Sequence, residues 1–279
     1  MSDAPGRLGI GAYGLRLEGV EDARPLLVEA GEDWPPLTVR REVGLAKSEV
    51  EWMSDRAAAL LLQNGGEIAV DRASSEALFR LPQPLGAAEL VHPLLAPAAA
   101  VVGYWLGRES FHAGAFVSGG KAWGVVGDRE AGKSTTVAAL ALAGVPIVCD
   151  DMLVLDDVRA RVAPRSVDLR EESAVRLGVG EALGMVGARE RWRLRLEPAE
   201  DAVPLGGWIF LAWGDDTRLE PASASTRLRL LHANRGVRIP PHDPSAMLEL
   251  SALPGWELRR RRRWDELADG VQRLLDAVG

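Results

Sequence analysis

The sequence predicts an α/β protein in which a β-rich first part is followed by a β-loop-α-β unit. A short apolar run, Ala122–Val126, precedes a glycine-bounded turn, and Ser134–Ala143 after that turn is typical of a helix. A second apolar run of strand length, Ile147–Cys149, follows, and Met152–Leu155 is expected to continue it. This alternation of strand, loop, helix and strand is typical of an α/β sheet.

The first part of the chain shows the pattern of short strands and turns. Leu37–Arg41 and Ala77–Leu81 are strand candidates. Ala58–Leu62 and Glu67–Asp71 flank Gln63-Asn64-Gly65-Gly66, which predicts a hairpin because Asn and Gly tolerate positive φ. Residues 1–105 contain no metal-ligand spacing and no nucleophile motif. We therefore expect a β-rich N-terminal domain over residues 1–105, with binding, lid and oligomerisation roles open, and a second domain over 106–279 that contains the β-loop-α-β unit.

Composition excludes several classes of protein. Of the 279 residues, 47% are hydrophobic and 26% are charged, which is typical of a globular chain and excludes a disordered tail or a collagen-like fibre. A single cysteine excludes an intrachain disulfide framework. The net charge of −7 argues against a general nucleic-acid binder. Only three of the 33 basic residues are lysine: Lys47, Lys121 and Lys133.

The sequence also predicts that the chain has no membrane partner. Its first fifteen residues contain no continuous apolar run behind a basic start, so we expect no signal peptide. The longest stretch without a formal charge, Leu90–Gly107, is interrupted by His92, Pro93 and Pro97. A buried helix that begins near Pro97 is the better interpretation, because proline suits a first helical turn. We expect a soluble, cytoplasmic protein.

The turn between the strand and the helix carries a phosphate-binding motif. Gly127-Asp128-Arg129-Glu130-Ala131-Gly132-Lys133-Ser134 matches G-x-x-x-x-G-K-[ST]. Glycines let such a loop wrap a phosphate closely, and the following helix presents free N–H groups to the same anion. Lys133 can reach the β- and γ-phosphates, and the Ser134 hydroxyl can ligate Mg²⁺. The alternative is a chance match, but the strand before and the helix after favour nucleotide binding.

Two adjacent carboxylates, Asp150 and Asp151, follow the second strand. A carboxylate at a strand end beside a phosphate loop is where a Mg²⁺ ligand or a general base is needed. The alternative is a solvated turn, which is our interpretation of Asp156-Asp157. His112 precedes the loop and either assists proton transfer or has only a structural role.

Several other features have both a structural and a functional interpretation. The run Arg259–Arg263 is a solvated strand-to-helix junction or a docking site for an acidic ligand. Arg191, Arg193 and Arg195 alternate with apolar residues, which predicts a strand with one basic face. The remaining candidates are Arg165 and Arg170, which could stabilise transferred charge, and Cys149, a buried strand residue whose modification could inactivate the protein.

The segment Phe111–Leu155, FHAGAFVSGGKAWGVVGDREAGKSTTVAALALAGVPIVCDDMLVL, resembles the HPr kinase/phosphorylase family, especially its shorter relatives. The shared marks are a histidine, a strand, a loop from Gly-Asp to Gly-Lys-Ser, a helix and Asp-Asp. Weaker similarity extends over residues 106–279. The resemblance implies a P-loop kinase core with a mixed sheet, akin to phosphoenolpyruvate carboxykinase, behind a variable N-terminal domain.

The resemblance also implies roles for individual residues. Asp150 would take the proton from an acceptor hydroxyl, Asp151 would bind or orient Mg²⁺, and His112 would lie near Asp150 and the transferred phosphoryl group. The ATP phosphates and Mg²⁺ would be held by Gly127, Gly132, Lys133, Ser134 and Thr135, with Asp128, Arg129, Glu130 and Ala131 completing the loop.

The acceptor implied is a serine hydroxyl. The Glu-Ile-Arg-Gly-Leu-Gly-type signature of the bifunctional enzymes is missing, and Glu171 and Glu172 stand in its region in a different context. The shorter relatives resemble enzymes that modify ribosomal peptides, including lasso peptides, so we expect a peptide or small-protein substrate. A kinase for a free metabolite and a nucleotide-dependent peptide-binding module remain alternatives, and the oligomeric state is open.

Overall fold

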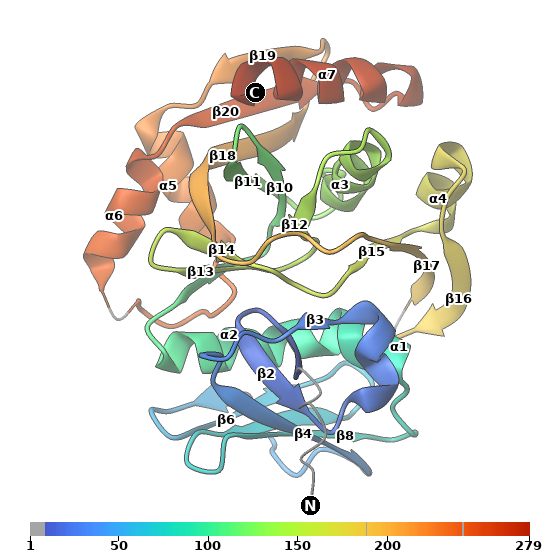
Figure 1. Cartoon of the computed structure of the whole chain (residues 1–279), viewed down its shortest axis with the longest axis vertical. Helices are drawn as coiled ribbons and strands as arrows, with labels where there is room; N and C mark the ends of the chain where they lie inside the picture. Colours follow the sequence, from blue (N-terminus) through green and yellow to red (C-terminus); the bar gives the residue numbers. More distant parts are fainter. Residues whose placement is uncertain (1–8, 188, 242) are drawn as a thin grey trace, which may run out of the picture.

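The computed structural model describes residues 9–187, 189–241 and 243–279. An eight-stranded sheet from the first part of the chain and a nine-stranded sheet from the second lie on opposite sides of a central helical layer (Figure 1). A three-stranded sheet projects beside them. The mixed α/β class predicted from the sequence is confirmed. The first eight residues of the segment expected to lack a signal peptide lie outside the described residues.

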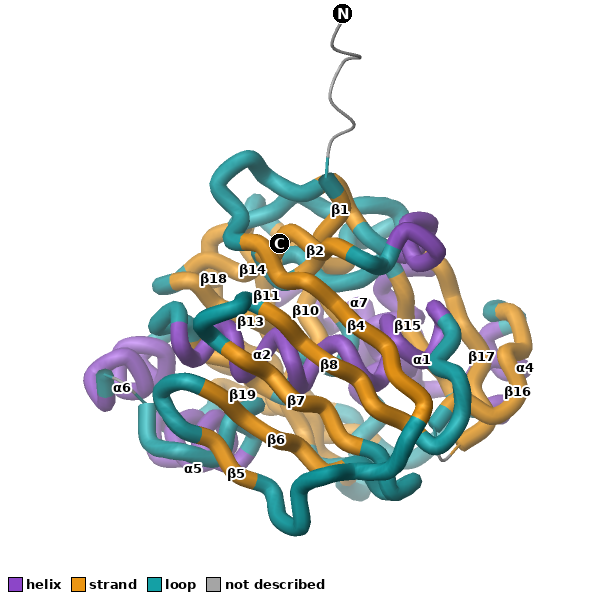
Figure 2. The backbone as a smooth tube through the Cα atoms, turned by 90° about the horizontal axis from the view of Figure 1, so that it is seen from below, coloured by secondary structure: helices purple, strands orange, loops and turns teal. Residues whose placement is uncertain are grey.

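The first sheet contains the strands expected between residues 37 and 81. Its order is β3-β1-β2-β4-β8-β7-β6-β5, which Figure 2 shows from below. The predicted hairpin is present as β6 and β7, and Gly65 in its turn has a φ of +82°. The strands are β1 (Ile10–Ala12), β2 (Leu15–Glu18), β3 (Val28–Glu29), β4 (Pro36–Val43), β5 (Trp52–Met53), β6 (Ala57–Leu61), β7 (Glu67–Asp71) and β8 (Glu76–Leu81), with the 3-10 helix η1 (Glu21–Leu26) after β2.

A run of short helices joins the two large sheets: α1 (Ala87–Glu89), η2 (Leu90–Leu94) and α2 (Leu95–Trp105). By length and composition, Ala87–Trp105 could cross a membrane, but 56% of its apolar window is buried inside the protein. Most of α2 is buried, as expected for the core helix of a soluble protein. The buried helix predicted near Pro97 is therefore confirmed.

The second sheet carries the phosphate loop. Its order is β12-β10-β11-β18-β14-β13-β9, with β20 paired to β18 and β19 to β20. β11, β18 and β20 are parallel and their other neighbours antiparallel, so the sheet is mixed, as the resemblance implied. The strands are β9 (Glu109–Phe111), β10 (Gly114–Ser118), β11 (Lys121–Gly127), β12 (Ile147–Cys149), β13 (Leu153–Asp156), β14 (Arg159–Arg161), β18 (Val203–Trp213), β19 (Arg218–Pro221) and β20 (Gly255–Arg260).

Alternation along β18 divides the core between the two faces of this sheet. Trp208 and Phe210 belong to the larger apolar cluster, which continues into the first sheet, whereas Ile209 and Leu211 belong to a second cluster under α3 and α7. The Trp208 indole also donates a hydrogen bond of 2.8 Å to the Leu250 carbonyl. The helices are α3 (Lys133–Leu142), α5 (Ala224–Ala233), α6 (Pro244–Ala252) and α7 (Leu267–Val278), with the 3-10 helix η3 (Trp264–Glu266) before α7.

A buried ion pair fixes the small sheet of β15 (Ser166–Leu169), β16 (Glu181–Val186) and β17 (Arg189–Arg195). The Arg193 guanidinium donates two hydrogen bonds, of 2.6 and 2.7 Å, to the Asp168 carboxylate. It donates a third, of 3.1 Å, to the Ala88 carbonyl in α1. The Arg193 side chain thus ties the small sheet to the N-terminal part. Helix α4 (Glu171–Leu177) lies between β15 and β16 along the chain.

One sequence prediction is wrong. Met152–Leu155 does not continue the strand of Ile147–Cys149, because β12 pairs with β10 whereas β13 pairs with β9 and β14. Asp151 interrupts the backbone between them with a φ of +76°, in the left-handed region where a strand cannot continue. The two carboxylates lie at this break.

Candidate functional site

The phosphate loop connects the end of β11 to the start of α3, and both of its glycines are sterically required. A Cβ on Gly127 would lie 2.9 Å from the Ala131 Cβ. Gly132 has a φ of +84°, and a Cβ there would lie 2.6 Å from an Arg260 guanidinium nitrogen. The loop is therefore tightly packed at both glycines.

Lys133 is buried at the start of α3. Its Nζ donates hydrogen bonds to the carbonyls of Gly127, at 2.8 Å, and Asp128, at 3.4 Å. Burial lowers the pKa of Lys133, although the charges of Asp151 and Asp150 act in the opposite direction. The ammonium group thus lies inside the loop that it would share with a phosphate.

Asp150 follows β12 and is only 7% exposed. Its Oδ1 is buried and has no hydrogen-bond partner among the residues that the structure describes. Burial and then the charge of Asp151 raise the pKa of Asp150 to about 7, against the opposing effect of a hydrogen bond with Ser134. A carboxyl group with a free oxygen and a pKa near neutrality has the properties of a general base.

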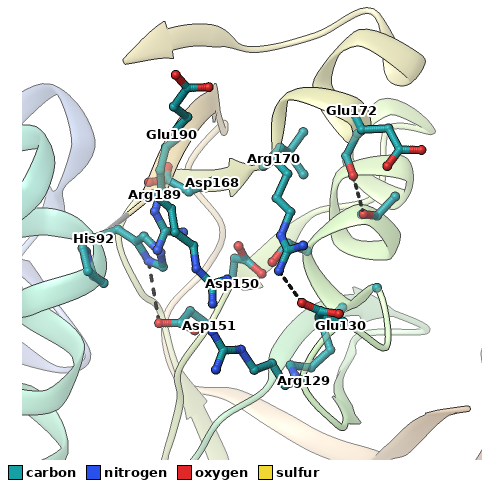
Figure 3. Close-up of a pocket in the computed structure, with 18 of the residues that line it drawn as sticks. His92, Arg129, Glu130, Asp150, Asp151, Asp168, Arg170, Glu172, Arg189 and Glu190 are labelled. Carbon is teal, nitrogen blue, oxygen red and sulfur yellow. Dashed lines mark hydrogen bonds and ion pairs between the residues drawn. The ribbon is translucent and has the colours of Figure 1, made fainter. Parts of the chain in front are cut away.

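Asp151 has the opposite electrostatic character. Burial alone would raise its pKa, but the hydrogen bond and charges of its neighbours hold the pKa well below its usual value. The Nδ1 of His112 lies 3.1 Å from one carboxylate oxygen, and the Nδ1 of His92 lies 3.7 Å from the other. Figure 3 shows Asp151 facing His92, beside Asp150. Asp151 is therefore an ionised carboxylate at neutral pH.

His92 is the site residue that sequence reasoning missed. It lies in η2, in the part of the chain where no chemistry was expected, and burial lowers its pKa. Nothing in the local sequence distinguishes it from a histidine in a hydrophobic core. Only the packing of η2 against the second sheet brings it to Asp151.

These groups lie in a cleft of about 1220 Å³ between the N-terminal part, the second sheet and the small sheet. Asp150, Asp151, Lys133 and Ser134 lie in its wall with His112. Thr135 also lines it, and its hydroxyl is 3.0 Å from that of Ser173 in α4. Figure 3 shows Arg129 and Arg189 extending toward the aspartates. Of the predicted loop residues, Arg129, Glu130 and Gly132 line the cleft, whereas Gly127, Asp128 and Ala131 do not.

The alternating arginines occupy different environments. Arg191 lines the cleft, and its Nε is buried without a partner among the described residues. Arg193 is bound by Asp168 and Arg195 is exposed, so the basic face predicted for this strand is only partly available to a ligand. Arg170 lines the cleft and pairs with Glu130 at 2.8 Å, whereas Arg165 lies outside it and donates to the Leu196 carbonyl.

The burial of Arg260 and of Cys149 corrects two further expectations. Arg259–Arg263 is not simply a solvated edge, because Arg260 is buried and Arg260 to Arg263 line the cleft. Cys149 is fully buried and burial raises the pKa of its thiol. A buried thiol of raised pKa is unreactive, so modification of Cys149 does not offer a route to inactivation.

The oxygen donors fit Mg²⁺ of the kind that a kinase shares with its nucleotide. Mg²⁺ commonly uses one or two carboxylates and completes its shell with phosphate oxygens and water. Ser134 and Asp151 supply such a hydroxyl and carboxylate beside the phosphate loop. Within residues 9–187, 189–241 and 243–279, no three His, Cys, Asp or Glu side chains form a metal cluster.

Comparison with known proteins adds little to this geometry. No family model matches the chain. No curated protein matches it. The solved structures that are similar include the HPr(Ser) kinase/phosphatase from Coxiella burnetii, at 12% sequence identity and a TM-score of 0.29, over 61% of this chain and 99% of that one. At that TM-score the likeness carries no argument about fold or activity, so the case for function comes from the site.

Proposed function

We propose that this protein is an ATP-dependent kinase that transfers the γ-phosphate to a serine hydroxyl of a peptide or small protein. The observation that carries the proposal is Asp150, a buried carboxyl group beside a phosphate loop, with one oxygen that has no partner among the described residues. Leaving a buried polar atom unpartnered is unfavourable, and such atoms are concentrated at functional sites.

The loop and helix α3 account for nucleotide binding. Backbone N–H groups at the start of α3 would bind the phosphates together with Lys133. Ser134 and Asp151 would hold Mg²⁺, which neutralises charge on the phosphates when it is bound. The family resemblance stated above supports the same assignment of residues.

Asp150 would accept the proton of the acceptor hydroxyl. As the acceptor oxygen forms its bond to the γ-phosphorus, the bond from that phosphorus to the bridging oxygen of ADP breaks, and ADP leaves with the bonding electron pair. A base with a pKa near 7 is ionised often enough at neutral pH and still binds the proton effectively. Asp151, held ionised by His112 and His92, remains available as a metal ligand during this exchange.

The cleft is large enough to hold an acceptor beside the nucleotide. Small-molecule pockets are typically about 300–1,000 Å³, and this cleft measures about 1220 Å³. Its wall includes Leu62, Gln63 and Asn64 of the N-terminal hairpin as well as residues of the phosphate loop. A nucleotide and a peptide segment can therefore be placed in it together.

The test uses the purified protein with Mg²⁺, ATP and a panel of serine-containing peptides, with phosphate transfer followed by mass spectrometry. Asp150→Asn should bind ATP as the wild type does and lose transfer by at least about 10²-fold. Asp157→Asn, at an exposed turn outside the cleft, is the matched control and should transfer at the wild-type rate.

Each alternative function has its own outcome. If Asp150→Asn transfers phosphate at the wild-type rate, Asp150 is not the general base. Phosphorylation of a metabolite panel but of no peptide would identify a small-molecule kinase. Peptide binding that depends on ATP without any phosphorylated product would identify a binding module.

A further inference from the structure

The strands on the two sides of β11 bring different residues to the two sides of the phosphate loop. Asp150 follows β12, which lies on one side of β11 beyond β10. On the other side, β18 and β20 run parallel to β11, so all three end at the same edge of the sheet. Trp213 and Arg260 are register partners at the ends of β18 and β20.

This arrangement fixes the direction of a bound nucleoside triphosphate. Transfer requires the terminal phosphate to face Asp150, on the β12 side of the loop. The remaining phosphates, the sugar and the base would then extend away from Asp150, and the ends of β18 and β20 lie on that side of the loop. Ligands of open α/β sheets bind outside the carboxyl ends of the strands, and β11, β18 and β20 all end at this edge.

An aromatic ring stands at that position. Trp213 is 41% exposed and lines the cleft, yet its indole N–H donates a hydrogen bond of 3.2 Å to the Glu130 carbonyl of the loop. The guanidinium carbon of Arg260 lies 4.9 Å from the centre of the ring. The ring is therefore held against the loop while part of it remains open to a ligand.

Arg262 is the arginine of its run that is available to bind an anion. Its neighbours are engaged: Arg259 pairs with Glu257, Arg261 with Glu266, and Arg263 with Asp265. Arg260 donates to the Ala131 carbonyl. Arg262 makes no ion pair with any described residue, is exposed, and lies 6.0 Å from the Trp213 ring.

We propose that Trp213 and Arg262 form the nucleoside subsite, in which the indole stacks on the base and the guanidinium contacts the α-phosphate. This inference rests on the proposed function, because it assumes that triphosphate occupies the loop. Stacking on an aromatic ring tolerates different bases but favours the larger purines, which cover more of the ring. The site therefore takes purine nucleoside triphosphates more tightly than pyrimidine ones.

Calorimetric titration with Mg-ATP and with Mg-tripolyphosphate separates the base from the phosphates. Trp213→Ala should weaken ATP binding on the order of tenfold, because the base loses its stacking partner, and leave tripolyphosphate binding unchanged. Trp213→Phe keeps a ring but loses the hydrogen bond to Glu130, and it should stay within about threefold of the wild type for both ligands. Arg262→Gln should weaken both ligands severalfold.

The controls are Trp52→Ala, a tryptophan of similar exposure outside the cleft, and Arg259→Gln, an exposed arginine of the same run outside the cleft. Equal weakening of ATP and tripolyphosphate by Trp213→Ala, or a Phe variant as weak as the Ala variant, would show that the ring only supports the loop. Unchanged ATP binding in Trp213→Ala would contradict the proposed nucleoside subsite and leave the proposed function untouched. If the wild-type protein binds neither ligand, both the subsite and the proposed function are contradicted. If it binds ATP but transfers no phosphate, only the kinase activity is contradicted and the subsite stands.

Discussion

The two walls of the cleft differ in how the chain builds them. The proposed catalytic wall comes almost entirely from one continuous segment, residues 127–151, which contains the phosphate loop, the proposed base and the proposed metal ligand. His112, between β9 and β10, is the addition from outside that segment. The acceptor wall comes from separate segments that fold together. These are Leu62–Asn64, Glu89–Leu94, Asp168–Arg176 and Gly187–Arg191, of which residue 188 is not described.

If the proposed function is correct, one wall carries out phosphate transfer and the other selects the acceptor. Phosphate binding dictates the spacing of the catalytic wall, so its residues should be needed whatever the acceptor. The acceptor wall has no such constraint and can change with the molecule that is phosphorylated. Changes in the first wall should therefore lower turnover for every acceptor, and changes in the second should alter the KM of the acceptor alone.

The largest effect is expected at Lys133. Lys133→Met should reduce turnover about 10²–10³-fold with every acceptor, because it removes the cation that stabilises the transferring phosphate. Lys121→Met, an exposed lysine outside the cleft, is the matched control. Steady-state phosphate transfer with two unrelated acceptors is the measurement. A loss confined to one acceptor would break the distinction between the walls.

The pH profile tests the base. The ionised form of Asp150 is the active one, and its pKa is raised to about 7, so the rate should rise with pH through neutrality. Between pH 8 and pH 6 kcat/KM for the acceptor should fall about tenfold, because the ionised fraction of Asp150 in the free protein falls by that factor. ATP affinity measured over the same range separates catalysis from binding. A flat profile would contradict the assignment of Asp150.

His92 connects the two walls. It comes from η2 of the acceptor wall, and its Nδ1 lies 3.7 Å from Asp151 of the catalytic wall. His92→Leu should raise the Mg²⁺ concentration needed for half-maximal activity severalfold, because Asp151 loses a positioning neighbour. His92→Gln should restore part of the loss, and His232→Leu, at an exposed position on α5, should change nothing. An unchanged Mg²⁺ requirement in His92→Leu would show that His92 does not position Asp151, and that no contact through His92 links the two walls.

A smaller and more selective effect is expected at Arg191. Its buried Nε has no partner among the described residues, and it lines the acceptor wall. Arg191→Gln should raise the KM of the acceptor about three- to tenfold, as expected for loss of a charged hydrogen bond, and leave that of ATP unchanged. Arg195→Gln is the control, since it lies on the same face of β17 but is exposed. Equal changes in both KM values would place Arg191 in nucleotide binding.

The smallest effect concerns stability. The folded pKa of Asp150, about 7, lies above its ordinary value, so the folded state loses stability as the pH rises from about 4 to 7. Asp150→Asn removes this cost and should raise the free energy of unfolding by about 1–3 kcal/mol at pH 8, with little change at pH 4. Urea unfolding at both pH values measures it. Destabilisation at pH 8 would mean that the carboxylate has structural partners.

The residues of the proposed catalytic wall could be named from the sequence because they are close along the chain and have the spacing of a phosphate-binding motif. It also predicted the hairpin from Asn and Gly in the turn. It could not find His92 or Trp213, because strand order and the packing of η2 bring them to the loop over long separations. The strand break at Asp151 was missed for a related reason: its left-handed conformation is imposed by the surroundings, not by the apolar pattern.

The contact between Arg193 and the Ala88 carbonyl bears on how such a protein diversifies. A backbone carbonyl is present whatever amino acid occupies that position, proline included. Substitutions at residue 88 that keep the backbone in place therefore preserve the attachment. The tie between the small sheet and α1 therefore depends on the position of the backbone at residue 88 and not on the side chain that it carries.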